Sequence, residues 1–309
     1  MAIAPKDLGH GWFFFQRGWL NGNHLASLGK ETILIDSGYL EGLDQTLALL
    51  GQAGVDPARV DRLLTTHVHC DHVGGHAAIH QASGCRVELS EVSRRVIENQ
   101  DLWAAWPAYY GQAYRFFPTH STIAPGDRMD LNGLAWLALD APGHAAGQLC
   151  FFCPDLGWLV AADAVWDNDF GVLNLCVEGH DAALRQRETL RTLAGLPVTM
   201  VIPGHGPLLP DGGGAIAKCL SRVEGFLADP GKIWRDQMRK ILLYTVMMHQ
   251  PVAWERYQVL VLGAPWFQDA CRRFFPQDPA KLLQEQLAEL VERGLVRREH
   301  GSLSTPLPV

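Results

Sequence analysis

A group of three histidines and one aspartate, set between a predicted strand and a predicted helix, constrains this chain more than any other feature. It reads TTHVHCDHVGG at residues 65–75. The apolar run at residues 62–66 predicts a strand before it, and the spacing of apolar residues over 73–81 predicts a helix after it. In extended backbone, side chains two apart point to the same side, so His67 and His69 are expected to face one way.

These side chains would be costly to bury without a partner, and a divalent cation satisfies all of them. Imidazole and carboxylate are typical ligands of Zn²⁺, and Fe²⁺ and Mn²⁺ accept them too. A solvated, histidine-rich loop is the alternative, but further candidate ligands recur just past predicted strands. They are His144, Asp163 and His205, which follow apolar runs at residues 134–139, 158–161 and 198–202. Loops at strand ends can converge at one sheet edge, so the sequence predicts a metal site there.

Strand and helix signals alternate over the first 210 residues. Further strands are predicted at residues 12–15, 32–35 and 148–153, and further helices at 43–50 and 181–193. This alternation indicates a mixed α/β fold. We therefore expect a catalytic domain over residues 1–210.

The chain changes character after Asp211-Gly212-Gly213-Gly214, which we interpret as a linker or sharp turn. Helices are predicted at residues 215–227, 233–249, 252–262 and 279–293, followed by a small hairpin over 295–304. Helices closed by a two-stranded wing resemble a winged-helix domain, so a second, mainly helical domain is expected over residues 215–309. From Asp211 to the end, 13 Lys and Arg stand against 11 Asp and Glu. This balance gives thin support for nucleic-acid binding, so nucleic acid is not the expected partner.

Composition excludes several classes of protein. Of the 309 residues, 48% are hydrophobic and 19% are charged, which is typical of a chain with a sizeable core. The net charge of −7 calls for no polyanionic partner. The longest apolar run, residues 241–248, is too short for a membrane helix, and the first residues lack the layout of a signal peptide. Seven irregularly spaced cysteines indicate free thiols, so we expect a cytoplasmic protein with no membrane contact.

The H-x-H-x-D-H group, followed by His144, Asp163 and His205, resembles the signature of the metallo-β-lactamase fold superfamily at all seven positions. Over about the first 210 residues, the resemblance implies an αββα sandwich with two divalent cations at one edge. Zn²⁺ is the expected metal, with Fe²⁺ or Mn²⁺ as alternatives. One cation would be held by His67, His69 and His144. The other would be held by Asp71, His72 and His205, and Asp163 would bridge both.

The same resemblance implies a hydrolase. Two cations about 3.5–4 Å apart can share one water and lower its pKa toward about 7, so that the resulting hydroxide attacks an acyl carbonyl. Asp71 and Asp163 would act as catalytic residues that balance charge and orient this nucleophile. A small-molecule acyl thioester is the expected substrate, because a thiolate leaves readily, and the sequence identifies no proton donor for a poorer leaving group.

Some positions depart from particular groups of the superfamily. Glyoxalase II and acyl-lactone hydrolases usually carry Thr after the third His, where this chain has Ala145, and a further His where it has Gln148. Ala161-Ala162 replaces the usual Thr-Gly, and the Gly-Cys-Gly-Arg stretch of glyoxalase II is missing from the sequence. These departures disfavour a glutathione thioester specifically. The H-x-H pair disfavours redox use, because di-iron flavoprotein oxidases carry H-x-E.

An aromatic segment at residues 101–118 lies where this superfamily often inserts substrate-covering elements. It predicts an aromatic wall for an apolar acyl group. Alternatively, its rings pack on the body of the protein or on a second copy in a homodimer. The candidate substrate-binding residues are Trp103, Trp106, Tyr109, Tyr110 and Tyr114, together with Trp166 and Phe170.

Other functions stay open at this point. A lactonase, or another ester or β-lactam hydrolase, would use the same metal centre. A nuclease or phosphodiesterase would use the C-terminal part to bind RNA or DNA. A sensor that keeps a metal site is the non-enzymatic alternative, and the complete ligand set argues against it.

Overall fold

The computed structural model describes residues 3–309, and two β-sheets face each other in it. Within these residues the first sheet has seven strands in chain order. The first four strands pair antiparallel with one another, and the fourth to the seventh pair parallel, so the fourth strand takes part in both arrangements. They are β1 (Lys6–Gly9), β2 (Trp12–Phe15), β3 (His24–Leu28), β4 (Thr32–Ile35), β5 (Arg62–Leu64), β6 (Arg86–Leu89) and β7 (Ser121–Thr122).

The second sheet has five strands within the same residues, in the order β12-β11-β10-β9-β8. Its strands are β8 (Arg128–Leu131), β9 (Leu134–Asp140), β10 (Leu149–Cys153), β11 (Trp158–Ala162) and β12 (Met200–Pro203). Neighbours pair antiparallel except β11 and β12, which run parallel. The predicted strands therefore exist, with ends within about two residues of those expected.

A shared apolar core joins the two sheets. Phe14 of β2 and Phe151 of β10 belong to it, and the Trp12 and Trp136 rings lie 5.0 Å apart across it. Burying such rings provides the main free energy that holds the sheets together.

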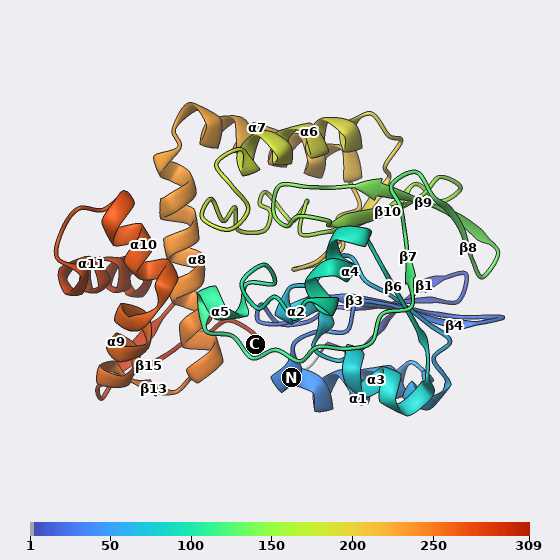
Figure 1. Cartoon of the computed structure of the whole chain (residues 1–309), viewed down its shortest axis with the longest axis horizontal. Coiled ribbons are helices and arrows are strands. Elements are labelled where there is room, and N and C mark those ends of the chain that lie inside the picture. The colour runs from blue at the N-terminus through green and yellow to red at the C-terminus, as the bar shows by residue number, and fades with distance from the viewer. Residues whose placement is uncertain (1–2) are drawn as a thin grey trace.

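Helices cover both outer faces of the pair of sheets. Figure 1 shows α1 (Leu43–Gln52) and α3 (His76–Ser83) below the first sheet, and α6 (Ala182–Ala194) and α7 (Gly212–Ala228) above the second. The layers run helix, sheet, sheet, helix, and the expected mixed α/β fold is confirmed. Three further helices lie at the edges: α2 (Cys70–Val73), α4 (Glu91–Glu98) and α5 (Pro107–Tyr110).

The prediction of a linker at residues 211–214 was wrong, because these residues begin α7. The Asp211 side chain accepts a hydrogen bond from the Gly214 amide at 3.0 Å and so caps the helix. Gly212 lies so close to Val198 that a β-carbon there would collide with it. The glycines therefore allow a close approach between a helix and the strand connection beside it.

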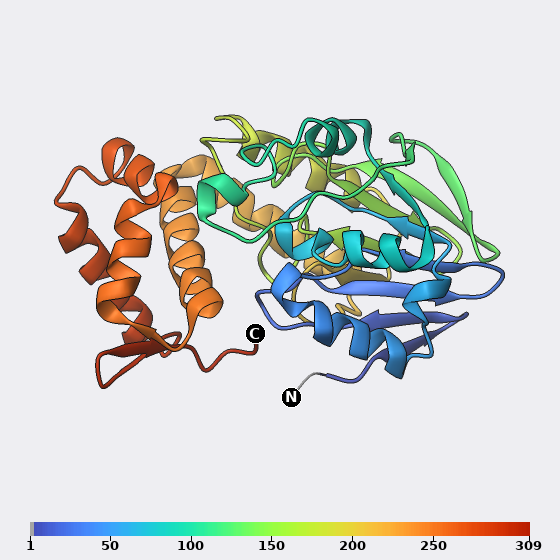
Figure 2. The ribbon, with the colours of Figure 1, turned by 60° about the horizontal axis from the view of Figure 1, so that its bottom comes forward.

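The C-terminal part is mainly helical, as expected. Its helices are α8 (Gly231–His249), α9 (Trp254–Gly263), α10 (Pro265–Arg273) and α11 (Pro279–Glu292), and β13 (Val252–Ala253), β14 (Arg297–Glu299) and β15 (Ser302–Ser304) form a small sheet. Figure 2 shows this part beside the sandwich, with α8 between the sandwich and the other helices. The core under α6 and α7 continues through α8 into α11. The winged-helix assignment and the boundary at residues 210–215 stay predictions.

Within residues 3–309, no helix is both long enough and apolar enough to cross a membrane.

Candidate metal centre

The histidine-rich segment leaves the end of β5 and turns into α2. His67 and His69 lie in the extended stretch before α2, and Asp71 and His72 lie in the first turn of this helix. The sequence predicted one helix over residues 73–81, but the structure breaks it. The Gly74 amide donates to the Gly38 carbonyl at 2.7 Å, and the Gly75 amide donates to the Ser37 hydroxyl at 3.0 Å. These bonds tie the turn to the end of β4.

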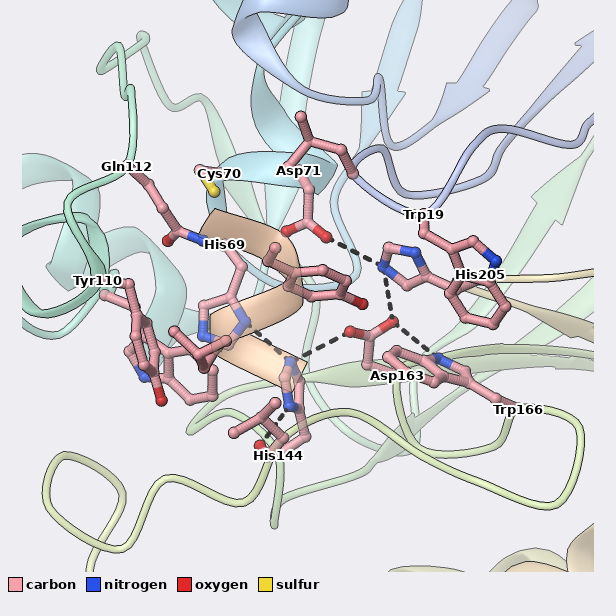
Figure 3. Close-up of a pocket in the computed structure, with 15 residues that line it drawn as sticks. Trp19, His69, Cys70, Asp71, Tyr110, Gln112, His144, Asp163, Trp166 and His205 are labelled. Atoms are coloured by element: carbon pink, nitrogen blue, oxygen red, sulfur yellow. Dashed lines mark hydrogen bonds and ion pairs between the residues drawn. The ribbon is translucent and has the colours of Figure 1, made fainter. Parts of the chain in front are cut away.

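The other three candidate ligands lie after strands of the second sheet. His144 follows β9, Asp163 follows β11 and His205 follows β12. The structure brings all seven residues to one edge of the sandwich, and Figure 3 shows five of them around a cavity. Three groups have ligand atoms within 4.8 Å of one another: His67, His69 and His144; His67, His72 and Asp163; and Asp71, His72 and His205.

Asp163 lies between the first and the third of these groups. One of its oxygens, Oδ2, is 3.2 Å from Nε2 of His144. The other, Oδ1, is 3.4 Å from Nε2 of His72 and 3.9 Å from Nε2 of His205. Gly204 fits against this carboxylate, and a β-carbon at that position would collide with Asp163 Oδ1. One carboxylate thus faces both sides of the site.

Hydrogen bonds on the far side of the rings fix which nitrogen of each histidine faces inward. The Nδ1–H of His72 donates to Asp36 Oδ2 at 2.8 Å, and the Nδ1–H of His144 donates to the Val172 carbonyl at 2.8 Å. Neither acceptor carries a proton to give, so Nδ1 holds the proton of each neutral ring, and the inward Nε2 of His72 and of His144 is the atom left with a lone pair.

His67 is fixed in the same way through a hydroxyl. Thr66 donates its hydroxyl proton to Asp36 Oδ2 at 2.7 Å, so its oxygen accepts from Nδ1–H of His67 at 3.1 Å. The Nε2 of His67 is buried and has no hydrogen-bond partner among residues 3–309. A buried lone pair without a donor, surrounded by imidazoles and carboxylates, fits a divalent cation.

The electrostatics of the site favour positive charge at its centre. Burial, together with the charges of His72 and His69, lowers the pKa of His67 far below its usual value, so its ring stays neutral. For His72, burial works in the same direction, but the carboxylates of Asp163 and Asp71 prevail and raise its pKa. Burial alone would raise the pKa of Asp163, yet His72 and His205 hold it far below its usual value. Two ionised carboxylates therefore face the centre of the site, and the positive charge that they favour on His72 is one that a bound metal ion could supply instead.

Aromatic and aliphatic side chains form much of the remaining wall of the cavity. The lining residues besides the candidate ligands are Trp19, Leu20, Cys70, Trp106, Tyr110, Gln112, Trp166, Val172, Ile241 and Tyr244. Trp106 lies against the site, with its ring centroid 3.8 Å from that of His69. No Lys or Arg from residues 3–309 is among the lining residues of this cavity.

Of the seven aromatic residues singled out in the sequence, three line this cavity. They are Trp106, Tyr110 and Trp166, and the indole Nε1 of Trp166 donates to Asp163 Oδ1 at 3.2 Å. Their role toward substrate stays a prediction.

The other four aromatic residues do not line it. Trp103 is 47% exposed on the surface. The Tyr109 hydroxyl donates to Asp269 at 3.3 Å and so ties α5 to α10, while the Tyr114 hydroxyl donates to the Val68 carbonyl at 2.9 Å. Phe170 is fully buried and its ring packs on Phe226 of α7. Tyr109, Tyr114 and Phe170 therefore anchor segments around the cavity, whereas Trp103 faces solvent.

Several residues of the site were not predicted from the sequence. Asp36 carried a readable signal, since it is a carboxylate directly after a buried β-branched strand. Trp19, Gln112 and Tyr244 carried none, because only long-range packing brings them to the cavity. Cys70, which stands between His69 and Asp71 in the chain, also lines the cavity (Figure 3).

Comparisons with known proteins agree with this geometry. Residues 25–205 match the model of the metallo-beta-lactamase superfamily. The chain is 30% identical over 148 residues to a hydroxyacylglutathione hydrolase of Cereibacter sphaeroides, and the aligned region covers 48% of this chain and 49% of that protein. It is 27% identical over 186 residues to an acyl-coenzyme A thioesterase of Bos taurus, and this aligned region covers 53% of this chain and 67% of that protein. The chain thus spans about half the length of the hydroxyacylglutathione hydrolases that it matches.

A solved structure resembles nearly the whole chain. A metallo-beta-lactamase family protein of Thermus thermophilus superposes with a TM-score of 0.61 at 18% identity, covering 97% of this chain and 100% of that one. This likeness shows the fold alone. The family model spans more than half of the sequence and includes all seven candidate ligands; the chain belongs to the metallo-beta-lactamase superfamily.

Proposed function

We propose that the protein is a hydrolase of acyl thioesters that works with two divalent cations. The position of Asp163 carries this proposal, because its two oxygens face two separate groups of ligand atoms. His67, His69 and His144 would hold one cation, and Asp71, His72 and His205 the other, with Asp163 shared. Zn²⁺ suits this set of nitrogen and oxygen ligands, and Fe²⁺ and Mn²⁺ are the alternatives.

Divalent cations at these positions would polarise the substrate carbonyl and make a water acidic enough to lose a proton near neutral pH. The side chains of the protein supply orientation. Asp36 and the Val172 carbonyl hold the rings of His72 and His144 in place. Trp166 holds Asp163 by its indole N–H. Trp106 covers His69 and keeps bulk water from that side of the site.

The cavity wall favours an uncharged, apolar acyl group. Apart from the candidate ligands, its side chains are aromatic, aliphatic or neutral, and none of the lining residues offers a cation to an anionic substrate group. A β-lactam would place its carboxylate beside the scissile bond, where the wall offers no Lys or Arg, and this disfavours that substrate. The matched relatives named as an acyl-coenzyme A thioesterase and a hydroxyacylglutathione hydrolase support thioester chemistry.

An uncharged ester or lactone is the second candidate substrate, and the same neutral wall favours it. A thioester comes first because a thiolate leaves without protonation, whereas a poorer leaving group needs a proton donor.

The domain boundary, the role of the C-terminal part, the cellular compartment and the oligomeric state belong to the same proposal. The catalytic domain would extend to about residue 210, and residues 215–309 would form a winged-helix-like domain that shapes the substrate site rather than binding nucleic acid. All seven cysteines are free thiols in the structure, which supports a reducing compartment such as the cytoplasm. A homodimer stays a prediction.

The test is thiol release from acyl-CoA and acyl-glutathione thioesters of increasing chain length, with zinc- and manganese-loaded protein. Asp163→Asn is the inactive comparison, and Asp130→Asn is its matched control, because Asp130 accepts a backbone hydrogen bond in a turn far along β8. Release that requires Asp163 but not Asp130 supports the proposal. Metal-loaded wild-type protein that releases no thiol from any thioester contradicts it.

A further inference from the structure

One face of helix α8 reaches the metal centre from the C-terminal part of the chain. Ile241 and Tyr244, one turn apart on this helix, line the same cavity as Asp71, Asp163 and His205. Figure 1 shows α8 running from the end of α7 down the side of the sandwich. The C-terminal helices thus supply part of the wall of the site itself.

A buried lysine fixes α8 against the loop that follows Asp163. The Nζ of Lys240 is 3.0 Å from Asp169 Oδ1 and 2.9 Å from Asp236 Oδ2, and it donates to the Phe170 carbonyl at 2.8 Å. The same nitrogen lies 5.2 Å from the ring centre of Trp166. Because all three donors of the ammonium group have partners, the turn of α8 that precedes Tyr244 is held in one position.

This anchored loop also carries the hydrogen bond to Asp163. Trp166 donates its indole N–H to Asp163, and its backbone amide donates to the Asp169 carbonyl at 2.7 Å. Lys240 therefore fixes Tyr244 and the Asp163 side of the site relative to each other.

The hydroxyl of Tyr244 is uncommitted. Among residues 3–309 it makes no hydrogen bond, although the side chain is half-buried in the wall. A phenol with its usual pKa of about 10 is protonated at neutral pH. Burial, and after it the charges of Asp71 and Asp163, raise the pKa of Tyr244 further. The group is thus a fixed, neutral hydrogen-bond donor beside the carboxylates of the metal centre.

We propose that the Tyr244 hydroxyl donates a hydrogen bond to the acyl oxygen of the substrate and stabilises the negative charge that develops there during attack on the carbonyl. This inference rests on the proposed hydrolase function. No proton is transferred, since the tyrosine donates the bond and keeps its proton. The C-terminal helices thereby contribute a catalytic residue, in addition to any effect on substrate shape.

The contribution expected from the Tyr244 hydroxyl is that of a typical oxyanion-stabilising hydrogen-bond donor. A preorganised donor aimed at a developing oxyanion contributes roughly 10²–10³ in kcat. Such a donor acts in the transition state, so its loss lowers kcat far more than it raises KM.

The experiment compares wild-type protein with Tyr244→Phe and with Tyr257→Phe. Tyr257 is a matched control because its hydroxyl donates to the Leu242 carbonyl at 2.9 Å, so its loss loosens the same helix without removing a group from the cavity. Three quantities are measured: kcat and KM for an acyl thioester, bound metal per chain, and the affinity for a thioether analogue in which CH₂ replaces the carbonyl.

We expect kcat of Tyr244→Phe to fall roughly 10²–10³-fold, while metal content and thioether affinity stay at wild-type values and Tyr257→Phe stays active. Loss of metal, or weaker binding of the thioether, would show that Tyr244 packs rather than donates and would overturn the inference. So would an unchanged kcat in Tyr244→Phe. If wild-type protein releases no thiol from any thioester, the proposed function fails and this inference fails with it, which is distinct from a failure of Tyr244 alone.

Discussion

Replacing Asp36 by Asn should weaken metal binding although Asp36 is not itself a candidate ligand. The carboxylate is 3% exposed and accepts three hydrogen bonds. Oδ1 accepts from the Thr66 amide at 2.9 Å, and Oδ2 accepts from the Thr66 hydroxyl and from Nδ1–H of His72. It thereby fixes the ring of His72 directly and that of His67 through Thr66.

An asparagine cannot accept all three bonds. If its NH₂ takes the place of Oδ2, it faces two donors, and relief requires His72 and His67 to move their protons from Nδ1 to Nε2. Those Nε2 atoms then lose the lone pairs that would bind metal. If the NH₂ instead takes the place of Oδ1, it opposes the Thr66 amide, which has no alternative tautomer, at a cost of about 1–3 kcal/mol.

Loss of a hydrogen-bonding partner behind a metal-binding histidine typically weakens metal affinity 10–100-fold, which is about 1.4–2.7 kcal/mol. We expect Asp36→Asn to fall in that range. The assay is a zinc titration of metal-free protein in competition with a chromophoric chelator. Asp130→Asn serves as the control, because it makes the same chemical change in an exposed turn. Wild-type affinity in Asp36→Asn would refute the assignment of the histidine tautomers.

Two further predictions concern stability. Glu178 accepts hydrogen bonds from the Trp106 indole and the Ala146 amide, and burial raises its pKa from 4.5 to about 7. Because the folded state then holds more protons, Glu178 lowers the free energy of unfolding as pH rises from about 4.5 to 7. Urea unfolding should show Glu178→Gln gaining stability relative to wild type between pH 5 and pH 8, and a constant difference would contradict this. Phe151 is fully buried between the sheets, so Phe151→Ala should cost roughly 3–5 kcal/mol in urea unfolding with an unchanged m-value; a loss below about 1 kcal/mol would contradict that packing.

The strands and the set of candidate ligands could be proposed from the sequence because both depend on local patterns. Apolar runs such as residues 149–153 become strands buried on both faces, and the candidate ligands stand directly after such runs. Their convergence followed from the rule that loops at one edge of a sheet lie close together.

The rest of the site depends on contacts that no local pattern encodes. Phe170 lies seven residues after Asp163 but packs under α7, whereas Tyr244 lies far along the chain and reaches the cavity. The run at residues 211–214 looked like a linker, since glycine disfavours helix, but the Asp211 cap and the close approach to Val198 override that preference. Tertiary packing decides such positions.

The central claim is that Asp163 joins two metal positions, and metal stoichiometry tests it most directly. Wild-type protein and Asp163→Asn would each be reconstituted with excess Zn²⁺, passed through a desalting column and analysed for zinc per chain, with circular dichroism as the check on folding. We expect about two zinc ions per wild-type chain and the loss of at least one of them in a folded Asp163→Asn variant. A wild-type chain that retains a single ion, or a variant that retains both with unchanged affinity, would contradict it.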